Sequence, residues 1–230
     1  MALKFLGSAG TGNLTNAVRA FYYAIENGAD VASNSWIGGP YIETVQQAVN
    51  YAYSQGVIMV AAAGNGNTSV PFYPAYYDNV ISVAATDSDD NRASFSNYGD
   101  WIDIAAPGVD ILSLRAEDTS IGTVYDPYTT VLSGTSMSCP HIAAACALLA
   151  GIRPGISIDS IEQALAESAD NIDPEICASG RLNMYAAMLR MRGPQGTVWI
   201  DDDAYSCSAL MKIKLFDTDL ESYGSQQITV

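Results

Sequence analysis

A serine inside a run of small and polar residues is the part of this chain best suited to covalent chemistry. The run is Gly134-Thr135-Ser136-Met137-Ser138-Cys139-Pro140-His141, and it leads directly into the apolar stretch Ile142 to Ala150, which predicts a buried helix. Gly134 permits a sharp turn, and Ser136 then lies at the helix N-terminus, where unpaired N–H groups and the helix dipole favour an anion. We expect Pro140 in the first helical turn, where its missing N–H is tolerated. An ordinary capped core helix uses the same residue types, but their combination indicates that Ser136 is a nucleophile.

The eight-residue run resembles the nucleophile motif of the subtilisin-like serine proteases, with Ser136 at the position of the catalytic serine. Six further segments resemble that family in the same order and spacing: Val31–Trp36, Ala61–Gly66, Tyr73–Ala75, Val80–Val83, Phe95–Gly99 and Ala106–Gly108. One short motif would be weak evidence, but six in the right order are strong. The resemblance covers about residues 3 to 190. It implies a three-layer α/β fold and a serine endopeptidase that acts on peptides or proteins without a cofactor for catalysis.

Asn65 matches the asparagine that helps to form the oxyanion hole in this family. The resemblance implies that its side-chain amide and the N–H of Ser136 hold the oxyanion during acyl transfer. Asn65 also stands between two glycines, and asparagine tolerates the left-handed backbone conformation. A simple turn residue is therefore the alternative interpretation, and both can hold at once.

Two strand ends would form the substrate groove if the resemblance holds. The residues concerned are Ser35, Trp36 and Gly38 on one wall, and Ala63 and Gly64 on the other. A substrate would pair with both edges and place its P1 side chain, next to the scissile bond, between them. The small and apolar walls favour a large or hydrophobic P1 residue. Ile37 departs from the family, which usually has glycine there. Its side chain either narrows the pocket, pushes the substrate strand away, or is ordinary strand packing.

The acid and base of a catalytic triad are missing from the segments that match. The family carries its aspartate in an Asp-Thr-Gly-like turn and its histidine in a His-Gly-Thr-like segment, and neither occurs in this sequence. The chain has one histidine, His141. It lies five residues beyond Ser136, about 7.5 Å further along a helix and on another face. Since a base must come within hydrogen-bond reach of the hydroxyl, we interpret His141 as structural.

Three functional hypotheses follow from this mismatch. The favoured one is the C-terminal portion of a subtilase, which we expect to be inactive by itself until an N-terminal segment supplies Asp and His. The second is a pseudoprotease that binds peptides in the retained groove. The third is one half of a split protease that a partner chain completes.

The composition limits the other classes of function. A net charge of −15 argues against binding to nucleic acid or to an anionic membrane surface, which require clusters of Lys and Arg. The longest apolar run, Ile142 to Ile152, is too short to cross a bilayer. Met1 to Gly12 has no apolar core of a signal peptide, so the chain carries no targeting signal, and an extracellular or secretory location is implied by the family resemblance alone.

The hydrophobic pattern predicts an α/β domain over residues 1–193. Helical periodicity over Leu14 to Ile25, a strand at Val31 to Ser35, a second helix ended by Gly56 and the apolar run Val57 to Ala62 together predict a crossover unit with a mostly parallel sheet. In such sheets ligands bind at the carboxyl ends of the strands, which would bring the groove residues and Ser136 to one edge. Further helices are predicted at Ile158 to Ser168 and Leu182 to Met191. Alternating strands after Gly193 predict that residues 194–230 are a linker and an incomplete β-sandwich-like domain.

A structural calcium ion is the one metal that the family resemblance suggests. Asp103 matches a position where some family members place a carboxylate ligand, and Asp78 and Val80 match positions that supply main-chain oxygens. Calcium binds six to eight such oxygen atoms. The alternative is that Asp103 points into solvent.

Overall fold

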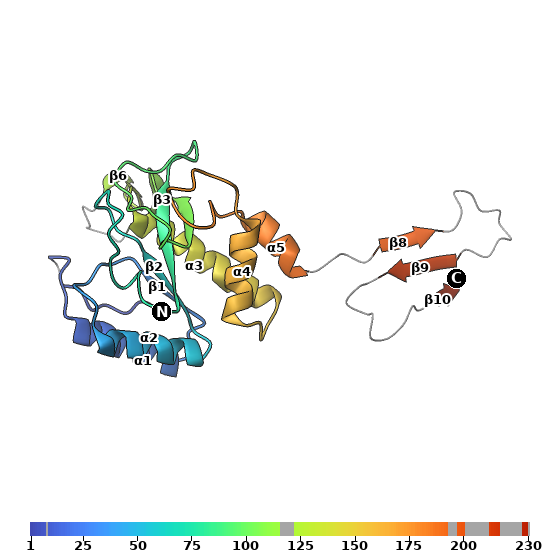
Figure 1. Ribbon diagram of the computed structural model, residues 1–230, viewed down its shortest axis with the longest axis horizontal. Coiled ribbons are helices and arrows are strands. Elements are labelled where there is room, and N and C mark those ends of the chain that lie inside the picture. The colour runs from blue at the N-terminus through green and yellow to red at the C-terminus, as the bar shows by residue number, and fades with distance from the viewer. Residues whose placement is uncertain (8, 116–121, 193–196, 201–211, 217–226, 230) are drawn as a thin grey trace.

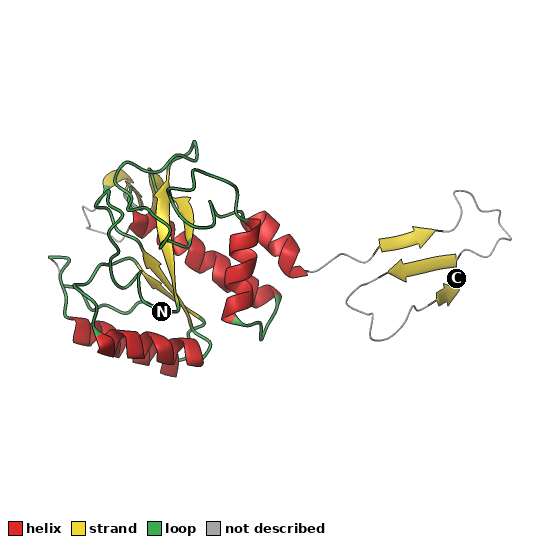
Figure 2. Ribbon diagram, in the orientation of Figure 1, coloured by secondary structure: helices red, strands yellow, loops and turns green. Residues whose placement is uncertain are grey.

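The computed structural model describes residues 1–7, 9–115, 122–192, 197–200, 212–216 and 227–229. Its centre is a parallel sheet in the order β1-β2-β3-β4 (Figures 1 and 2). The strands are β1 Val31–Asn34, β2 Ile58–Ala62, β3 Val80–Thr86 and β4 Ile104–Pro107. Every residue of β2 and β3 is buried, as expected of central parallel strands that are covered on both faces.

Helices cover both faces of this sheet, so that the domain has three layers (Figure 1). The helices are α1 Leu14–Glu26, α2 Glu43–Ser54, α3 Thr135–Ile152, α4 Ile158–Ser168 and α5 Met184–Arg192. Successive side chains of a strand point to opposite faces: Met59 and Ala61 of β2 pack with α1 and α2, whereas Ile58, Val60 and Ala62 pack with α3, α4 and α5. The predicted three-layer α/β fold with a parallel sheet is therefore confirmed.

The predicted helix starts are marked by caps. The Asn13 side chain accepts a hydrogen bond from the N–H of Thr15 at the start of α1. Ser157 accepts from the N–H of Ser160 at the start of α4. Gly28 and Gly56, just after α1 and α2, have φ of 72° and 79°, a left-handed conformation that glycine adopts readily.

Helix α3 is the buried helix that carries the serine motif. It begins at Thr135 with Gly134 as its cap, so Pro140 is its sixth residue. The expectation that Pro140 lies in the first turn was therefore wrong, because a helix that begins at Thr135 completes its first turn, of 3.6 residues, before it reaches residue 140. The 18 residues of α3 are long and apolar enough to cross a membrane, with a mean hydropathy of 1.4. They pack instead against all four strands of the parallel sheet and against α4 and α5.

Two antiparallel sheets accompany the parallel one. The first has the order β5-β7-β6, formed by β5 Ile111–Leu114, β6 Thr123–Asp126 and β7 Thr129–Leu132. The second has the order β10-β9-β8, formed by β8 Thr197–Ile200, β9 Lys212–Phe216 and β10 Gln227–Thr229. The strands predicted after Gly193 are present, while their assignment to a separate domain with a boundary at 193 remains a prediction.

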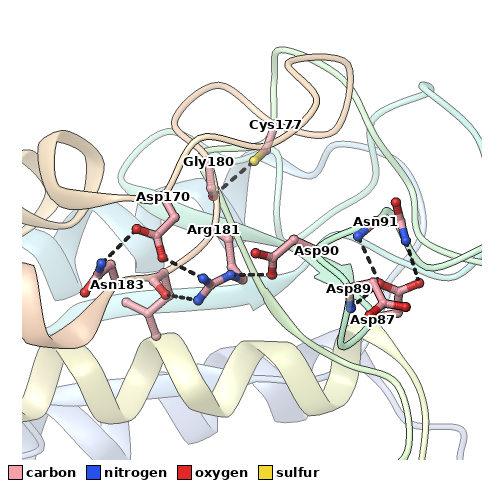
Figure 3. A network of polar contacts seen from close by, with 10 residues as sticks. Asp87, Asp89, Asp90, Asn91, Asp170, Cys177, Gly180, Arg181 and Asn183 are labelled. Carbon is pink, nitrogen blue, oxygen red and sulfur yellow. Dashed lines mark hydrogen bonds and ion pairs between the residues drawn. The ribbon is translucent and has the colours of Figure 1, made fainter.

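An arginine joins three segments at the β4 edge of the parallel sheet (Figure 3). Its Nε lies 2.5 Å from Asp90 Oδ1, in the loop after β3, and its Nη2 lies 2.6 Å from Asp170 Oδ2, after α4. This arginine, Arg181, also pairs through its main chain with Asp170 in both directions, and its neighbours Gly180 and Leu182 bond the main chain of Ala105 in β4. Arg181 therefore ties the β3 loop and the end of α4 to the sheet.

Candidate active site

Ser136 lies at the second position of α3 and faces the end of β1. Its Oγ donates a hydrogen bond to the carbonyl oxygen of Ser35 over 3.4 Å, and Ser35 Oγ donates to the carbonyl oxygen of Ser136 over 2.8 Å. In a regular helix the N–H four residues later bonds each carbonyl, but that residue is Pro140, which has no N–H. Ser35 therefore supplies the hydrogen bond that Pro140 cannot, and the nucleophile candidate is tied to the neighbouring strand.

Asn65 lies beside the start of α3 with its amide held in one orientation. Its Oδ1 accepts hydrogen bonds from both the N–H and the Oγ1 of Thr135, each 2.9 Å long. Its Nδ2 lies next to Gly134, where a Cβ would be only 3.3 Å from it. Asn65 is not among the residues with positive φ, so the alternative of a left-handed turn residue does not apply. The arrangement presents an N–H donor beside the N-terminus of α3, as oxyanion stabilisation requires.

Thr135 is a site residue that sequence reasoning missed. It is buried, with 1% of its surface exposed, and its Oγ1 also accepts a 3.1 Å hydrogen bond from the N–H of Gly64. One hydroxyl thus links the start of α3 to the Gly64-Asn65 turn. Its place beside Ser136 in the motif was the available signal, but the partner 70 residues away could not be identified from sequence.

The Ala63-Gly64 wall forms a rigid surface. The N–H of Ala63 donates to Val83 and that of Gly64 to Thr135, while Asn97 donates its N–H to the Gly64 carbonyl and its Nδ2 to the Ala63 carbonyl. We expected a substrate to pair with this edge, but each of these main-chain groups already has a partner. A substrate can therefore pack against this wall without main-chain hydrogen bonds to it.

The opposite wall, residues 35 to 38, is different. Within the described part of the chain, the main-chain groups of Ile37 have no hydrogen-bond partner, so they can pair with an extended peptide. The N–H of Gly38 donates to the Tyr73 carbonyl over 2.8 Å. The ring of Trp36 turns away, packing edge-on against Phe5 with centroids 5.1 Å apart. Trp36 therefore borders the groove mainly with its backbone.

The His141 side chain hydrogen-bonds within its own helix. Its Nδ1 lies 2.8 Å from the carbonyl oxygen of Met137, one turn earlier in α3. A histidine that bonds its own helix in this way does not reach the Ser136 hydroxyl, in agreement with the structural interpretation. Among the described residues, the Ser136 hydroxyl hydrogen-bonds to Ser35 and to no basic side chain.

The three residues considered for calcium line a single cavity of about 520 Å³, which Glu162 and Asp159 of α4 also line. Asp103 is exposed, but its Oδ2 accepts hydrogen bonds from Ser82 N–H (2.7 Å) and Ser82 Oγ (2.6 Å). The part of the chain that the structure describes holds no group of three or more His, Cys, Asp or Glu side chains that could bind a metal. An ion here would need the main-chain oxygens of Asp78 and Val80, which are donors that calcium accepts.

The carboxyl groups that line this cavity repel one another when they are ionised. Desolvation raises the pKa of the Asp103 carboxyl more than the hydrogen bonds from Ser82 lower it. Desolvation, followed by the charges of Asp103 and Asp159, raises the pKa of Glu162 to about 7. Glu162 and Asp159 are three residues apart on one helix, a spacing that places both on the same face.

A serine at the start of a buried helix, with a fixed amide donor beside it at the carboxyl edge of a parallel sheet, is the arrangement in which serine hydrolases hold a nucleophile and an oxyanion donor. The comparison with known families agrees. The family model described as "Subtilase family" matches residues 1–193. The chain belongs to the subtilase family.

Curated relatives agree with this membership, and solved structures agree with the fold. The chain is 42% identical over 190 residues to thermitase of Thermoactinomyces vulgaris, covering 82% of this chain and 64% of thermitase. It is equally similar to a thermophilic serine proteinase of Bacillus sp. strain AK1, of which it covers 45%. It thus spans between about half and two thirds of these relatives. Its fold resembles a lanthipeptide protease (TM-score 0.73, 22% identity, 83% of this chain and 69% of that one) and the prenylagaramide maturation protease PagA (TM-score 0.67, 27% identity, 82% and 71%).

Proposed function

We propose that this chain is the nucleophile-bearing part of a serine endopeptidase. The observation that carries the proposal is the position of Ser136 at the N-terminus of α3, with the Asn65 amide held beside it by Thr135. Ser136 Oγ would attack the carbonyl carbon of a peptide bond while a base takes its proton. The oxyanion would be held by Asn65 Nδ2 and the Ser136 N–H. Loss of the amine then leaves an acyl-serine, which water hydrolyses.

Peptide or protein chains are the proposed substrates, bound in extended form. The open main-chain groups of Ile37 would pair with the peptide, and the Ala63-Gly64 wall would contact the P1 side chain. An extracellular location is part of this proposal and rests on family resemblance.

The base and acid would come from a segment beside β1. β1 is at the edge of the described parallel sheet, so its outer side can accept another strand. An apolar groove of about 370 Å³ lies beside β1, and residues that line it include Met1, Leu3, Phe5 and Val31 to Asn34. A parallel strand in this groove would end beside Ser35 and Ser136, because carboxyl ends of parallel strands share one edge. The groove therefore suits an Asp- and His-bearing segment of the same protein or of a partner.

The coding sequence around this chain provides the first test. Asp-Thr-Gly-like and His-Gly-Thr-like segments in frame upstream, or on a neighbouring cistron, would support an endopeptidase in one chain or a split one. The completed protein should then hydrolyse casein, and Ser136→Ala should abolish this activity. A completed protein that binds peptides without cleaving them would be a pseudoprotease and would overturn the proposal.

A further inference from the structure

Ile37 spans the space between the two walls of the candidate groove. Its side chain is 48% exposed, and its Cδ1 lies only 3.0 Å from where a Cβ would stand on Gly64. Gly64 belongs to the opposite wall, so the methyl group rests on that wall. Ile37 is also absent from the hydrophobic core clusters of the described chain. Ordinary core packing therefore does not explain its position.

The two walls cannot easily move apart to make room. Both main-chain groups of Gly64 are bonded, to Thr135 and to Asn97. On the other side the N–H of Gly38 is bonded to Tyr73. Since the backbone on both sides is fixed, the side chain at position 37 determines the free width between the walls.

We propose that Ile37 restricts the groove to peptides with a small P1 residue, such as glycine, alanine or serine. The inference rests on the proposed peptidase function, because it assigns the P1 side chain to the space between these walls. An aromatic P1 side chain would have to displace Ile37 from Gly64, whereas a methyl group can lie beside it. This replaces the expectation of a large P1 residue, which rested on the small wall residues, and it takes up the alternative left open by the sequence, in which Ile37 narrows the pocket.

Two substitutions reduce this side chain stepwise without introducing glycine. Ile37→Val removes the Cδ1 that touches Gly64, and Ile37→Ala removes everything beyond Cβ. Leu189→Ala on α5, where the leucine is 43% exposed, is a matched control for loss of an exposed apolar side chain. Neither change at position 37 alters a core residue, so we expect all three variants to fold.

The experiment measures dissociation constants by fluorescence anisotropy for two fluorescein-labelled peptide amides, Ala-Ala-Ala and Ala-Ala-Phe. The unsubstituted chain and Leu189→Ala should bind the alanine peptide more tightly. Ile37→Ala should improve the affinity for the phenylalanine peptide relative to the alanine peptide about tenfold or more, a typical effect of pocket size, with Ile37→Val in between.

The outcomes separate the two proposals. Tight binding of the phenylalanine peptide by the unsubstituted chain, or an affinity ratio that Ile37→Ala leaves unchanged, would overturn the role of Ile37 while leaving a peptide-binding groove. Absence of binding by every variant would overturn the proposed function and the inference with it. The contact itself is tested independently of any peptide by an NOE between the Ile37 Cδ1 methyl and the Gly64 α-protons, and its absence would also overturn the inference.

Discussion

Ser35 and Ser136 exchange two hydrogen bonds, each hydroxyl donating to the other residue's carbonyl oxygen. The bond from Ser35 occupies a carbonyl that lacks its helical partner, because Pro140 has no N–H to offer. Pro140, four residues after Ser136, and Ser35, at the end of β1, thus both determine the hydrogen bonding of one carbonyl. The pair of hydrogen bonds connects the candidate nucleophile Ser136 to one wall of the candidate groove.

The Ser35→Ala variant tests the hydrogen bond from Ser35 to the Ser136 carbonyl. Removing the hydroxyl should destabilise the chain by about 1 kcal/mol, because the Ser136 carbonyl loses its partner. In a Pro140→Ala background the restored N–H can bond that carbonyl, so Ser35→Ala should then cost less. Denaturant unfolding of the four proteins gives the coupling energy. Equal losses in both backgrounds would show that the two residues do not act on the same carbonyl.

Arg181 should matter more for stability than another arginine in an ion pair. Arg181→Ala leaves Asp90 and Asp170 without their shared cation and should destabilise the chain by about 1.5–3 kcal/mol, the range for hydrogen bonds to charged groups. In the described part of the chain Arg190 has one ion-pair partner, Glu167, and both side chains are 40% or more exposed, so Arg190→Ala should cost about 0–1 kcal/mol. Urea unfolding of both variants checks the order. A larger loss for Arg190→Ala would contradict the role given to Arg181.

Glu162 should make stability depend on pH. Its pKa is raised from 4.5 to about 7 in the folded chain, so the folded state binds a proton that the unfolded state releases. Its contribution to stability is complete below about pH 4.5 and is lost as the pH rises through about 7. Glu162→Gln should flatten the fall of the melting temperature across this interval. The exposed Glu175→Gln is the control, and a Glu162→Gln profile that matches it would contradict the raised pKa.

Calcium should stabilise the chain if it binds at the cavity that Asp103 lines. A cation there would relieve the repulsion between Asp103 and Glu162, and at a hundred times its dissociation constant it would add about 2.7 kcal/mol. Melting curves with calcium and with a chelator should differ for the unsubstituted chain and for the control Asp89→Ala. They should coincide for Asp103→Ala. A shift that persists in Asp103→Ala would place the ion elsewhere.

The local parts of the fold could be predicted from sequence. α4 was predicted to the residue, Ile158–Ser168, because its apolar spacing and the Ser157 cap are both local signals. The antiparallel sheet of β5, β6 and β7 was not predicted. Most residues of β5 and β6 are exposed, so these strands lack the continuous apolar run that identified β2.

The candidate site was predictable in its residue types but not in its contacts. Ser136 and Asn65 were identified from motifs, whereas the Thr135 bonds to Asn65 and Gly64 join positions about 70 residues apart. The effect of Ile37 likewise depends on which residue faces it across the groove. Such relationships arise from tertiary packing, which periodicity along the chain does not encode.

The reactivity of Ser136 toward a fluorophosphonate probe tests the central claim most directly. A serine hydroxyl is a weak nucleophile until a base removes its proton, and His141 bonds its own helix instead. The account predicts slow labelling of this chain alone, and rapid labelling that Ser136→Ala abolishes once an Asp- and His-bearing segment completes the site. Rapid, Ser136-dependent labelling of the chain alone would show that a base is already present, and labelling of the completed protein that survives Ser136→Ala would show that the nucleophile is another residue.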